Sequence, residues 1–288
     1  MEYAIAAKTD VGIERSSNQD SLFVRTASWK GQNYAFAVVC DGMGGLSEGD
    51  MASRTVVEAM GSWFENSFAD WLNQGGRESV LCGIWTEVLQ RCNDQLIRYG
   101  KEKQIRLGTT ITAILLGPER YVIVHVGDTR AYEIGKVIRQ LTRDHTMATR
   151  MVESGVISRA EARMVPENHV LTRCIGVEET VDPAFYFGTT GANMVYLLCS
   201  DGFRNQFEEK ELWEAFEPEK CKDAETIVHA CEEWIRVSKE RREDDNISAI
   251  VIRTIPTAEP VKPRRDLDMT IVPDKPKPLR SLDDTVDL

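Results

Sequence analysis

Residues 38–50 read Val38-Val39-Cys40-Asp41-Gly42-Met43-Gly44-Gly45-Leu46-Ser47-Glu48-Gly49-Asp50. An apolar strand ends in Asp41 and a glycine-rich turn follows, because glycine adopts positive φ and permits close backbone approach at little cost. Ser47 and Asp50 then fit a capping box, which predicts the start of a long helix. A carboxylate beside bare backbone can offer a hard cation both a side-chain oxygen and a carbonyl oxygen. An ordinary Asp-Gly turn is the alternative, and this stretch alone leaves it open.

The same pattern recurs along the chain. Asp128 and Asp201 also follow apolar strands, whereas Asp20 and Asp245 stand just before such strands. If the strands form a two-sheet sandwich and share one rim, the five carboxylates converge there. Like charges repel strongly in a partly dry site, so we expect such a cluster to bind cations.

The residue types in this cluster restrict the metal and the chemistry. All-oxygen ligation, without a cysteine or histidine set, favours magnesium or manganese over zinc. Two such ions can hold a water as hydroxide, aimed in line at phosphorus. Arg15 lies close before Asp20 in a polar segment, and a guanidinium matches phosphate oxygens bidentately. A solvated loop with an incidental charge pair is the alternative for that segment.

Composition narrows the class of protein. The 288 residues carry a formal charge of 35 − 46 = −11, so we expect no nucleic-acid partner, and any phosphate chemistry on this surface needs cations. The seven cysteines include no Cys-x-x-Cys pair, which argues against a disulfide framework or zinc ribbon and indicates a reducing compartment. There is no signal-peptide pattern and no run of about 18 apolar residues, so we expect a soluble, cytoplasmic protein without a membrane segment.

Hydrophobic periodicity predicts the elements around these aspartates. Residues 47–72 and 77–99 have apolar positions at helical spacing and are expected to pack on a sheet. Residues 108–116 and 121–128 are expected to form an antiparallel hairpin. Further strands are predicted at 3–8, 22–24, 131–134, 184–187, 194–199 and 247–252, and further helices at 208–216 and 224–239.

Residues 147–163 have a short helical pattern poor in bulky apolar residues, typical of a surface insertion that acts as a lid. His125 lies inside an apolar run, and we expect a core histidine rather than a metal ligand. His145 either stabilises a turn by a hydrogen bond or titrates near neutral pH.

Seven motifs, in the family's order over about residues 1–254, resemble those of type 2C metal-dependent serine/threonine protein phosphatases of the compact bacterial sort. They are Arg15-Ser16-Ser17-Asn18-Gln19-Asp20, Val39-Cys40-Asp41-Gly42-Met43-Gly44-Gly45, Gly108-Thr109-Thr110, Val126-Gly127-Asp128-Thr129-Arg130, Leu141-Thr142-Arg143-Asp144-His145, Ser200-Asp201-Gly202 and Asp245-Asn246-Ile247-Ser248.

The resemblance implies an α+β fold, a four-layer α-β-β-α sandwich of two antiparallel sheets flanked by helices. One phosphatase domain would span residues 1–254, with a flap at about 146–178 that contributes to substrate choice. The implied reaction is hydrolysis of phosphoserine and phosphothreonine in proteins, by a water or hydroxide activated at a dinuclear Mg²⁺ or Mn²⁺ site. Phosphorylated proteins would be the substrates, and a cognate serine/threonine kinase is the expected counterpart.

The resemblance also assigns roles by motif match. Asp41 would bridge both ions, the Gly42 carbonyl would bind the second ion, and Asp201 and Asp245 would bind the first. Arg15 would clamp the substrate phosphate, and Asp20 would orient metal-bound water. Asp128, together with Asp201, would bind a looser third ion.

Two positions depart from the family pattern. Gln19 stands where many members have a glutamate that reaches metal-bound water, so one negative charge is missing beside the second ion. Met43 stands where animal members have a histidine proposed as general acid, and methionine cannot donate a proton. Protonation of the leaving group then falls to metal-bound water or another residue.

Residues 255–288 hold six of the ten prolines and neither glycine nor an aromatic residue, which predicts a disordered tail. Two of its segments resemble one another around Thr270 and Thr285. They are either parts of a solvated linker or phosphorylation sites read by a phosphothreonine-binding module or a partner kinase.

The alternative to an active enzyme is a catalytically weak or inactive phosphatase-fold scaffold that binds a phosphoprotein or kinase partner. Such a protein is expected to have lost Asp41, Asp201 or Asp245, and all three are present. A nucleotide-binding kinase or ATPase is excluded, because no lysine follows the glycines of the turn.

Overall fold

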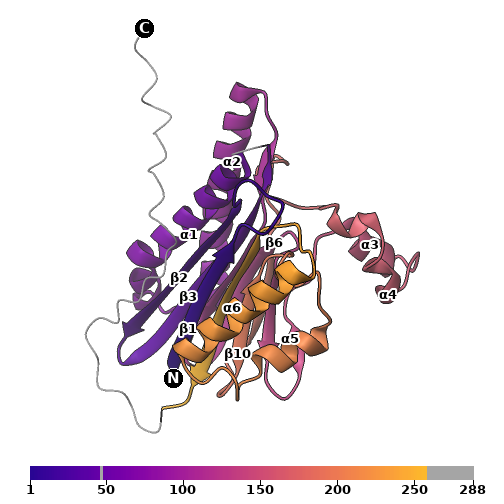
Figure 1. The fold of residues 1–288 in the computed structure, drawn as a ribbon. Coiled ribbons are helices and arrows are strands. Elements are labelled where there is room, and N and C mark those ends of the chain that lie inside the picture. The colour runs from indigo at the N-terminus through magenta and orange to yellow at the C-terminus, as the bar shows by residue number, and fades with distance from the viewer. Residues whose placement is uncertain (46–47, 258–288) are drawn as a thin grey trace.

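The computed structural model describes residues 1–45 and 48–257, and all structural statements below concern these residues. Two antiparallel sheets lie face to face, with helices on the outer face of each (Figure 1). The predicted α-β-β-α sandwich is thereby confirmed. The capping box predicted at Ser47 and the tail from 258, with Thr270 and Thr285, lie outside the described residues.

The strands form one five-stranded and one six-stranded sheet. The five-stranded sheet contains, in spatial order, β1 (Glu2–Asp10), β11 (Ile247–Ile255), β10 (Val195–Cys199), β7 (Arg130–Ile134) and β8 (Ile138–Gln140). The six-stranded sheet contains β2 (Asp20–Trp29), β3 (Gln32–Gly44), β5 (Ile111–Leu116), β6 (Arg120–Val126) and β9 (Ala184–Thr189), with β4 (Leu107–Thr109) paired to the end of β3.

The central strand β3 is buried on both faces, which explains its unbroken apolar run. Phe36 and Val38 belong to the core under the helices, whereas Ala37 and Val39 belong to the core between the sheets. Successive side chains of a strand point to opposite faces, so one strand contributes to both cores. The small residues on the inner side let the two sheets pack closely.

Four helices complete the outer layers. Helices α1 (Glu48–Asn73) and α2 (Glu78–Lys103) cover the six-stranded sheet, and α5 (Glu209–Phe216) and α6 (Ala224–Glu240) cover the other. Trp63 of α1 and Trp85 of α2 meet edge to face with ring centroids 5.3 Å apart. The apolar faces of α1 and α2 therefore pack on a sheet, as predicted.

The insertion between β8 and β9 extends away from the sandwich beside the end at which β6 is labelled (Figure 1). It contains α3 (Met147–Glu153), α4 (Arg159–Ala162) and the 3₁₀ helix η1 (Pro166–His169). Thr146 caps α3 by accepting a hydrogen bond from the Thr149 amide, and Ser158 caps α4 within a capping box. The helical segments predicted over 147–163 are present, but they are short and separate.

The hairpin predicted over 108–128 forms, yet its first strand is divided at Thr110 into β4 and β5. Thr110 makes two hydrogen bonds to Asp41 of β3. Its amide donates to the Asp41 carbonyl, and its hydroxyl accepts from the Asp41 amide. The strand therefore bends where it meets the predicted metal ligand.

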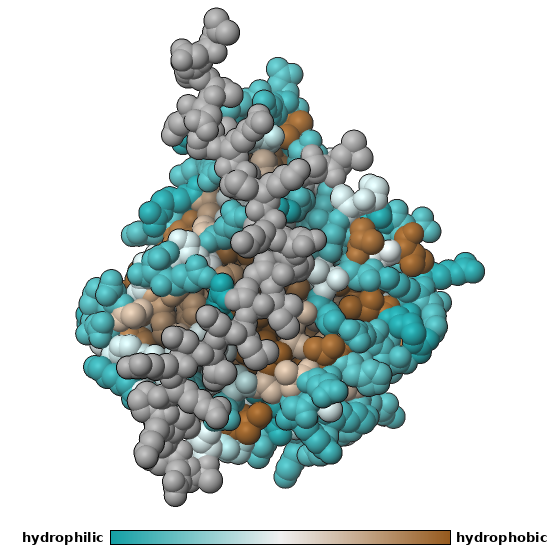
Figure 2. Space-filling view, turned by 60° about the vertical axis from the view of Figure 1, so that its left-hand side comes forward, coloured by the Kyte–Doolittle hydropathy of each residue, from teal (hydrophilic) through white to brown (hydrophobic). Residues whose placement is uncertain are grey.

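All seven cysteines are free thiols, and five of them are buried. In Figure 2 the described part of the visible face is predominantly hydrophilic, with hydrophobic side chains showing in several separate places. None of the described helices has both the length and the hydropathy needed to cross a bilayer.

Candidate metal centre

The five predicted aspartates gather at one end of the sandwich. The six-stranded sheet supplies Asp20, the first residue of β2, and Asp41, near the end of β3. Asp128 follows β6, Asp201 follows β10, and Asp245 precedes β11. Burial, and then the charges of the other four aspartates, raise the pKa of Asp41 well above its usual value. The convergence predicted from the sequence is therefore present.

Asp20 and Asp41 are direct partners across β2 and β3. The Cβ atoms of such antiparallel partners lie about 4.5–5.5 Å apart, on the same face. Asp20 is only 8% exposed, and burial, opposed by hydrogen bonds from Ser248 and Ser200, raises its pKa to about 7. Two buried carboxylates this close do not both ionise without a compensating cation.

The donor atoms at this centre fit a hard divalent cation. The carboxylate oxygens Asp20 Oδ2 and Asp201 Oδ1 are buried and have no hydrogen-bond partner among the described residues. Leaving a buried charged acceptor unsatisfied is costly, and an oxygen-binding ion such as Mg²⁺ or Mn²⁺ removes that cost. No three His, Cys, Asp or Glu side chains of the described part form a ready ligand set.

Two glycines allow the segments of the centre to touch. A Cβ on Gly42 would lie 2.0 Å from the Gly49 carbonyl oxygen and 2.7 Å from that of Gln19. A Cβ on Gly202 would lie 2.3 Å from the Asn246 carbonyl oxygen. At both Asp-Gly pairs, the absence of a side chain on glycine therefore lets two backbone segments pack directly against each other.

Arg15 lies at the centre but is paired with a predicted metal ligand. Its Nη2 atom donates to Asp245 Oδ2 at 2.8 Å, and its side chain is 50% exposed. Burial, followed by the charge of Asp201, raises the pKa of Asp245 against the effect of this arginine. The guanidinium thus reaches the rim and remains accessible to a ligand.

Asn246 is a structural member of the centre to which the sequence analysis gave no role. Its Nδ2 donates to the carbonyls of Val11 and Ser17 at 2.9 and 3.1 Å, and its Oδ1 accepts from the Gln19 amide at 2.8 Å. One side chain thus fixes the loop that carries Arg15 to the start of β11. The only sequence feature that could have indicated this role is that Asn246 follows Asp245 directly and precedes an apolar strand.

His169 of η1 is a second residue that the sequence analysis missed. Its Nδ1 lies 3.8 Å from Asp201 Oδ2, and this interaction raises the pKa of the imidazole. Nothing in the insertion's sequence marked which residue would return to the centre.

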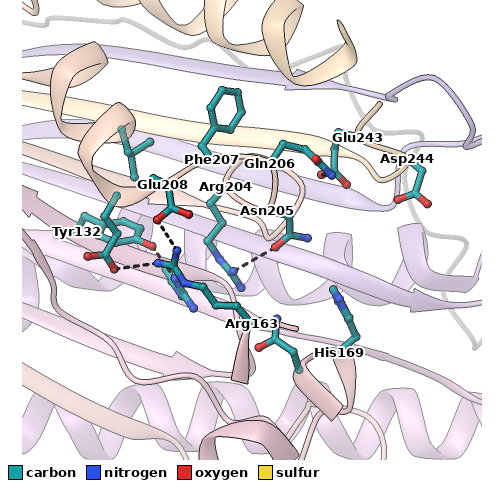
Figure 3. Close-up of a pocket in the computed structure, with 14 residues that line it drawn as sticks. Tyr132, Arg163, His169, Arg204, Asn205, Gln206, Phe207, Glu208, Glu243 and Asp244 are labelled. Carbon is teal, nitrogen blue, oxygen red and sulfur yellow. Dashed lines mark hydrogen bonds and ion pairs between the residues drawn. The ribbon is translucent and has the colours of Figure 1, made fainter. Parts of the chain in front are cut away.

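The insertion and the turn after β10 enclose a pocket of about 300 Å³ beside the aspartates (Figure 3). Arg163 and His169 enter it from the insertion, and Arg204 and Asn205 from the turn. Arg163 Nη1 bonds Glu208 Oε2 at 2.9 Å. This contact connects the insertion to the residue that caps α5.

His125 and His145 have structural roles. His125 is fully buried, with Nδ1 bonded to the Thr112 hydroxyl and Nε2 to the Arg143 carbonyl, and burial lowers its pKa to about 4. His145 Nδ1 accepts from the Gly127 amide at 3.2 Å, and burial lowers its pKa to about 3. The turn-stabilising bond predicted for His145 is present, and the lowered pKa disfavours its titration near neutral pH.

The two departures from the family pattern also have structural places. Gln19 Nε2 donates to the Gly45 carbonyl at 3.1 Å, so its amide is used within the glycine-rich turn. Met43 is part of β3, opposite Gly108 of β4.

Three comparisons relate this chain to known proteins. Residues 13–236 match the model of the protein phosphatase 2C family. The serine/threonine phosphatase Stp of Listeria monocytogenes is 29% identical over 248 residues, which make up 85% of this chain and 93% of that protein. The crystal structure of Stp1 from Staphylococcus aureus superposes with a TM-score of 0.74 at 26% identity, over 89% of this chain and 96% of Stp1. The catalytic domain of the phosphatase PstP, solved with two manganese ions, gives a TM-score of 0.70 at 25% identity, over 88% of this chain and 99% of that domain.

Proposed function

This chain belongs to the protein phosphatase 2C family, and we propose that its five-aspartate cluster is the metal centre at which phosphorylated proteins are hydrolysed. It is a metal-dependent protein serine/threonine phosphatase that uses Mn²⁺ or Mg²⁺ at a dinuclear site. The observation that carries the assignment of the residues is the pair of unsatisfied buried oxygens on Asp20 and Asp201.

Four residues hold the two principal ions in this proposal. Asp41 and the Gly42 carbonyl lie together at the end of β3, and Asp201 and Asp245 face them from the other sheet. Asp128 joins Asp201 as a ligand of a third, looser ion. When bound, these ions supply Lewis acidity to the phosphoryl oxygens and an activated water at neutral pH.

The remaining steps belong to side chains of the chain itself. The Arg15 guanidinium binds two oxygens of the substrate phosphate, which orients phosphorus toward the aspartates. Asp20 orients the attacking water through Oδ2, the oxygen without a protein partner. Met43 offers no proton to the departing serine or threonine oxygen, so that proton would come from metal-bound water or another residue.

The physiological setting is part of the proposal. The substrates are proteins that carry phosphoserine or phosphothreonine, placed there by a cognate serine/threonine kinase. Relatives named as serine/threonine phosphatases support the substrate class, and seven free thiols support a cytoplasmic location. The domain spans residues 1–254 with its flap at about 146–178, and recognition of Thr270 or Thr285 by a phosphothreonine-binding module remains a hypothesis.

The decisive experiment is hydrolysis of a phosphothreonine peptide and of p-nitrophenyl phosphate with Mn²⁺, with Mg²⁺ and with chelator, alongside Asp41→Asn. Metal-dependent activity that the variant loses is the expected result. A folded protein that is inactive with both metals would instead support the scaffold.

A further inference from the structure

Arg204 is a buried cation that touches two segments of the centre. Its side chain is 10% exposed, and its Nη2 donates to the Asp128 carbonyl at 3.2 Å. Its own amide donates to the Asp201 carbonyl at 2.9 Å. The two aspartates that share the proposed third ion are therefore both connected to this one residue.

The second connection runs through a side chain. Arg204 Nη1 donates to Asn205 Oδ1 at 3.2 Å, drawn as a dashed line in Figure 3. Asn205 Nδ2 in turn donates to Asp201 Oδ2 at 3.3 Å. The guanidinium thus orients the amide that holds the Asp201 carboxylate, while its other nitrogen holds the Asp128 backbone.

The Nη2 atom of Arg204 that donates to the Asp128 carbonyl also lies beside a buried ion pair. Asp144, 6% exposed, lies 3.7 Å from Arg204 Nη2 and accepts bonds of 2.9, 3.0 and 2.7 Å from Arg130. Gln140 Nε2 donates to the same carboxylate at 3.0 Å. Charge-assisted, multiply bonded groups of this kind have little freedom to rotate, so the position of Arg204 is fixed independently of the metal.

The charge of Arg204 also suits this position. Burial, and then Asp201, raise the pKa of Asp128 to about 7, and Arg204 opposes that rise. A fixed cation beside two carboxylates reduces their mutual repulsion and keeps both available as ligands.

We propose that Arg204 is a positioning residue that ties the Asp128 turn to the Asp201 turn and so sets the spacing at which these two carboxylates share the third ion. The inference rests on the proposed function, because it takes Asp128 and Asp201 as ligands of that ion. Arg204 touches neither substrate nor reacting atoms in this role.

The test uses Arg204→Met, which keeps the aliphatic stem and removes every donor, and Arg204→Lys, which keeps the charge but cannot serve both turns. The matched control is Arg241→Met. Arg241 Nη1 donates to the Gln206 carbonyl at 2.9 Å, and its Nη2 pairs with Glu211, so it holds the same turn without contacting Asp128 or Asp201 in the described residues. Asp128→Asn tests the premise.

Mn²⁺ binding to the full chain is counted by electron paramagnetic resonance of the free ion. We expect Arg204→Met to bind the first two equivalents as the wild type does and the third about tenfold more weakly, the effect of one charge-assisted hydrogen bond. Arg204→Lys should lie between, and Arg241→Met should match the wild type. Hydrogen exchange in chelator gives a metal-free readout: amides of residues 127–130 should exchange faster in Arg204→Met only.

If Arg204→Met binds the third equivalent of Mn²⁺ as tightly as the wild type, and Asp128→Asn does not bind it, this inference is overturned and the proposed third-ion site stands. Wild-type binding by both variants would overturn the third-ion site as well. If Arg204→Met does not fold, unchanged third-ion binding and exchange in Arg204→Lys overturn the inference by themselves.

Discussion

Arg15 Nη2 lies 2.8 Å from Asp245 Oδ2, so the guanidinium proposed to bind phosphate is bonded to a carboxylate proposed to bind metal. The two side chains are 50% and 29% exposed, and ion pairs with such exposure contribute about 0–1 kcal/mol. This ion pair is therefore easily broken, and either side chain can then bind another group of opposite charge. A residue of the N-terminal loop and a residue before β11 thus meet within one site.

Replacement of Arg15 tests the phosphate clamp. Arg15→Ala should raise the KM for a phosphothreonine peptide and the inhibition constant of inorganic phosphate by about tenfold each, because a charge-assisted bond is lost, with a smaller change in kcat. Arg15→Lys should recover part of the loss, since it keeps the charge without the bidentate geometry. Unchanged phosphate inhibition in Arg15→Ala would show that the phosphate binds elsewhere.

Replacement of Asp41 separates loss of chemistry from loss of fold. Asp41→Asn should lower kcat roughly a thousandfold, because a bridging ligand is removed. In chelator at pH 8 the variant should unfold at the same or a higher temperature than the wild type, because burial and the neighbouring aspartates raise the pKa of Asp41 and so disfavour its charge. The neighbouring Asp244→Asn, at an exposed position, is the control and should retain activity. A destabilised Asp41→Asn variant would contradict the electrostatic account.

The raised pKa of Asp128 predicts a pH-dependent difference in stability in the absence of metal. The carboxyl titrates near pH 3.8 when unfolded and at about 7 when folded, so between these values the folded state binds more protons. Stability contributed by the protonated form is complete below pH 3.8 and is lost as pH rises toward 7. In chelator, Asp128→Asn should therefore become more stable relative to wild type as pH rises from about 4 to 7. Urea unfolding at several pH values measures this, and a constant difference would disprove it.

Removal of the Asn246 side-chain amide should weaken the attachment of the N-terminal loop to β11 and so lower the free energy of unfolding. Asn246→Ala loses two donated bonds and one accepted bond between the loop at 11–19 and β11, which corresponds to about 3 kcal/mol of unfolding free energy. Activity should fall as well, because the same loop carries Arg15. Asn66→Ala, which removes an exposed bond within α1, is the control and should cost less than about 1 kcal/mol. Equal urea midpoints for the two variants would refute this role.

The sequence predicted the elements and most of the centre because their signals are local. The apolar run of β3, the apolar faces of α1 and α2 and the turn glycines are each visible in short segments of sequence, so they can be read residue by residue. Motif matching then identified Asp41, Asp201 and Asp245 as members of one centre. The division of the strand at Thr110 escaped prediction, because it depends on bonds to Asp41 across the sheet.

Residues whose roles are defined by distant partners could not be found in this way. Arg204 and Asp128 are 76 positions apart, and no local pattern indicates that one donates to the carbonyl of the other. The same holds for His169, which returns from an irregular insertion to within 3.8 Å of Asp201. Hydrogen-bond networks of this kind follow from packing in three dimensions and leave no periodic trace.

Strand periodicity, glycine positions and residue chemistry are properties of short segments, so the fold class, the family and the set of carboxylates could be inferred from the order of amino acids. Only the tertiary structure decided how those carboxylates are held: which oxygens are left unsatisfied, that Arg15 lies on Asp245, and that Arg204 lies between Asp128 and Asp201. The physical reason is burial. Removing these charges from water makes each depend on whichever partners the packed chain places within hydrogen-bond distance.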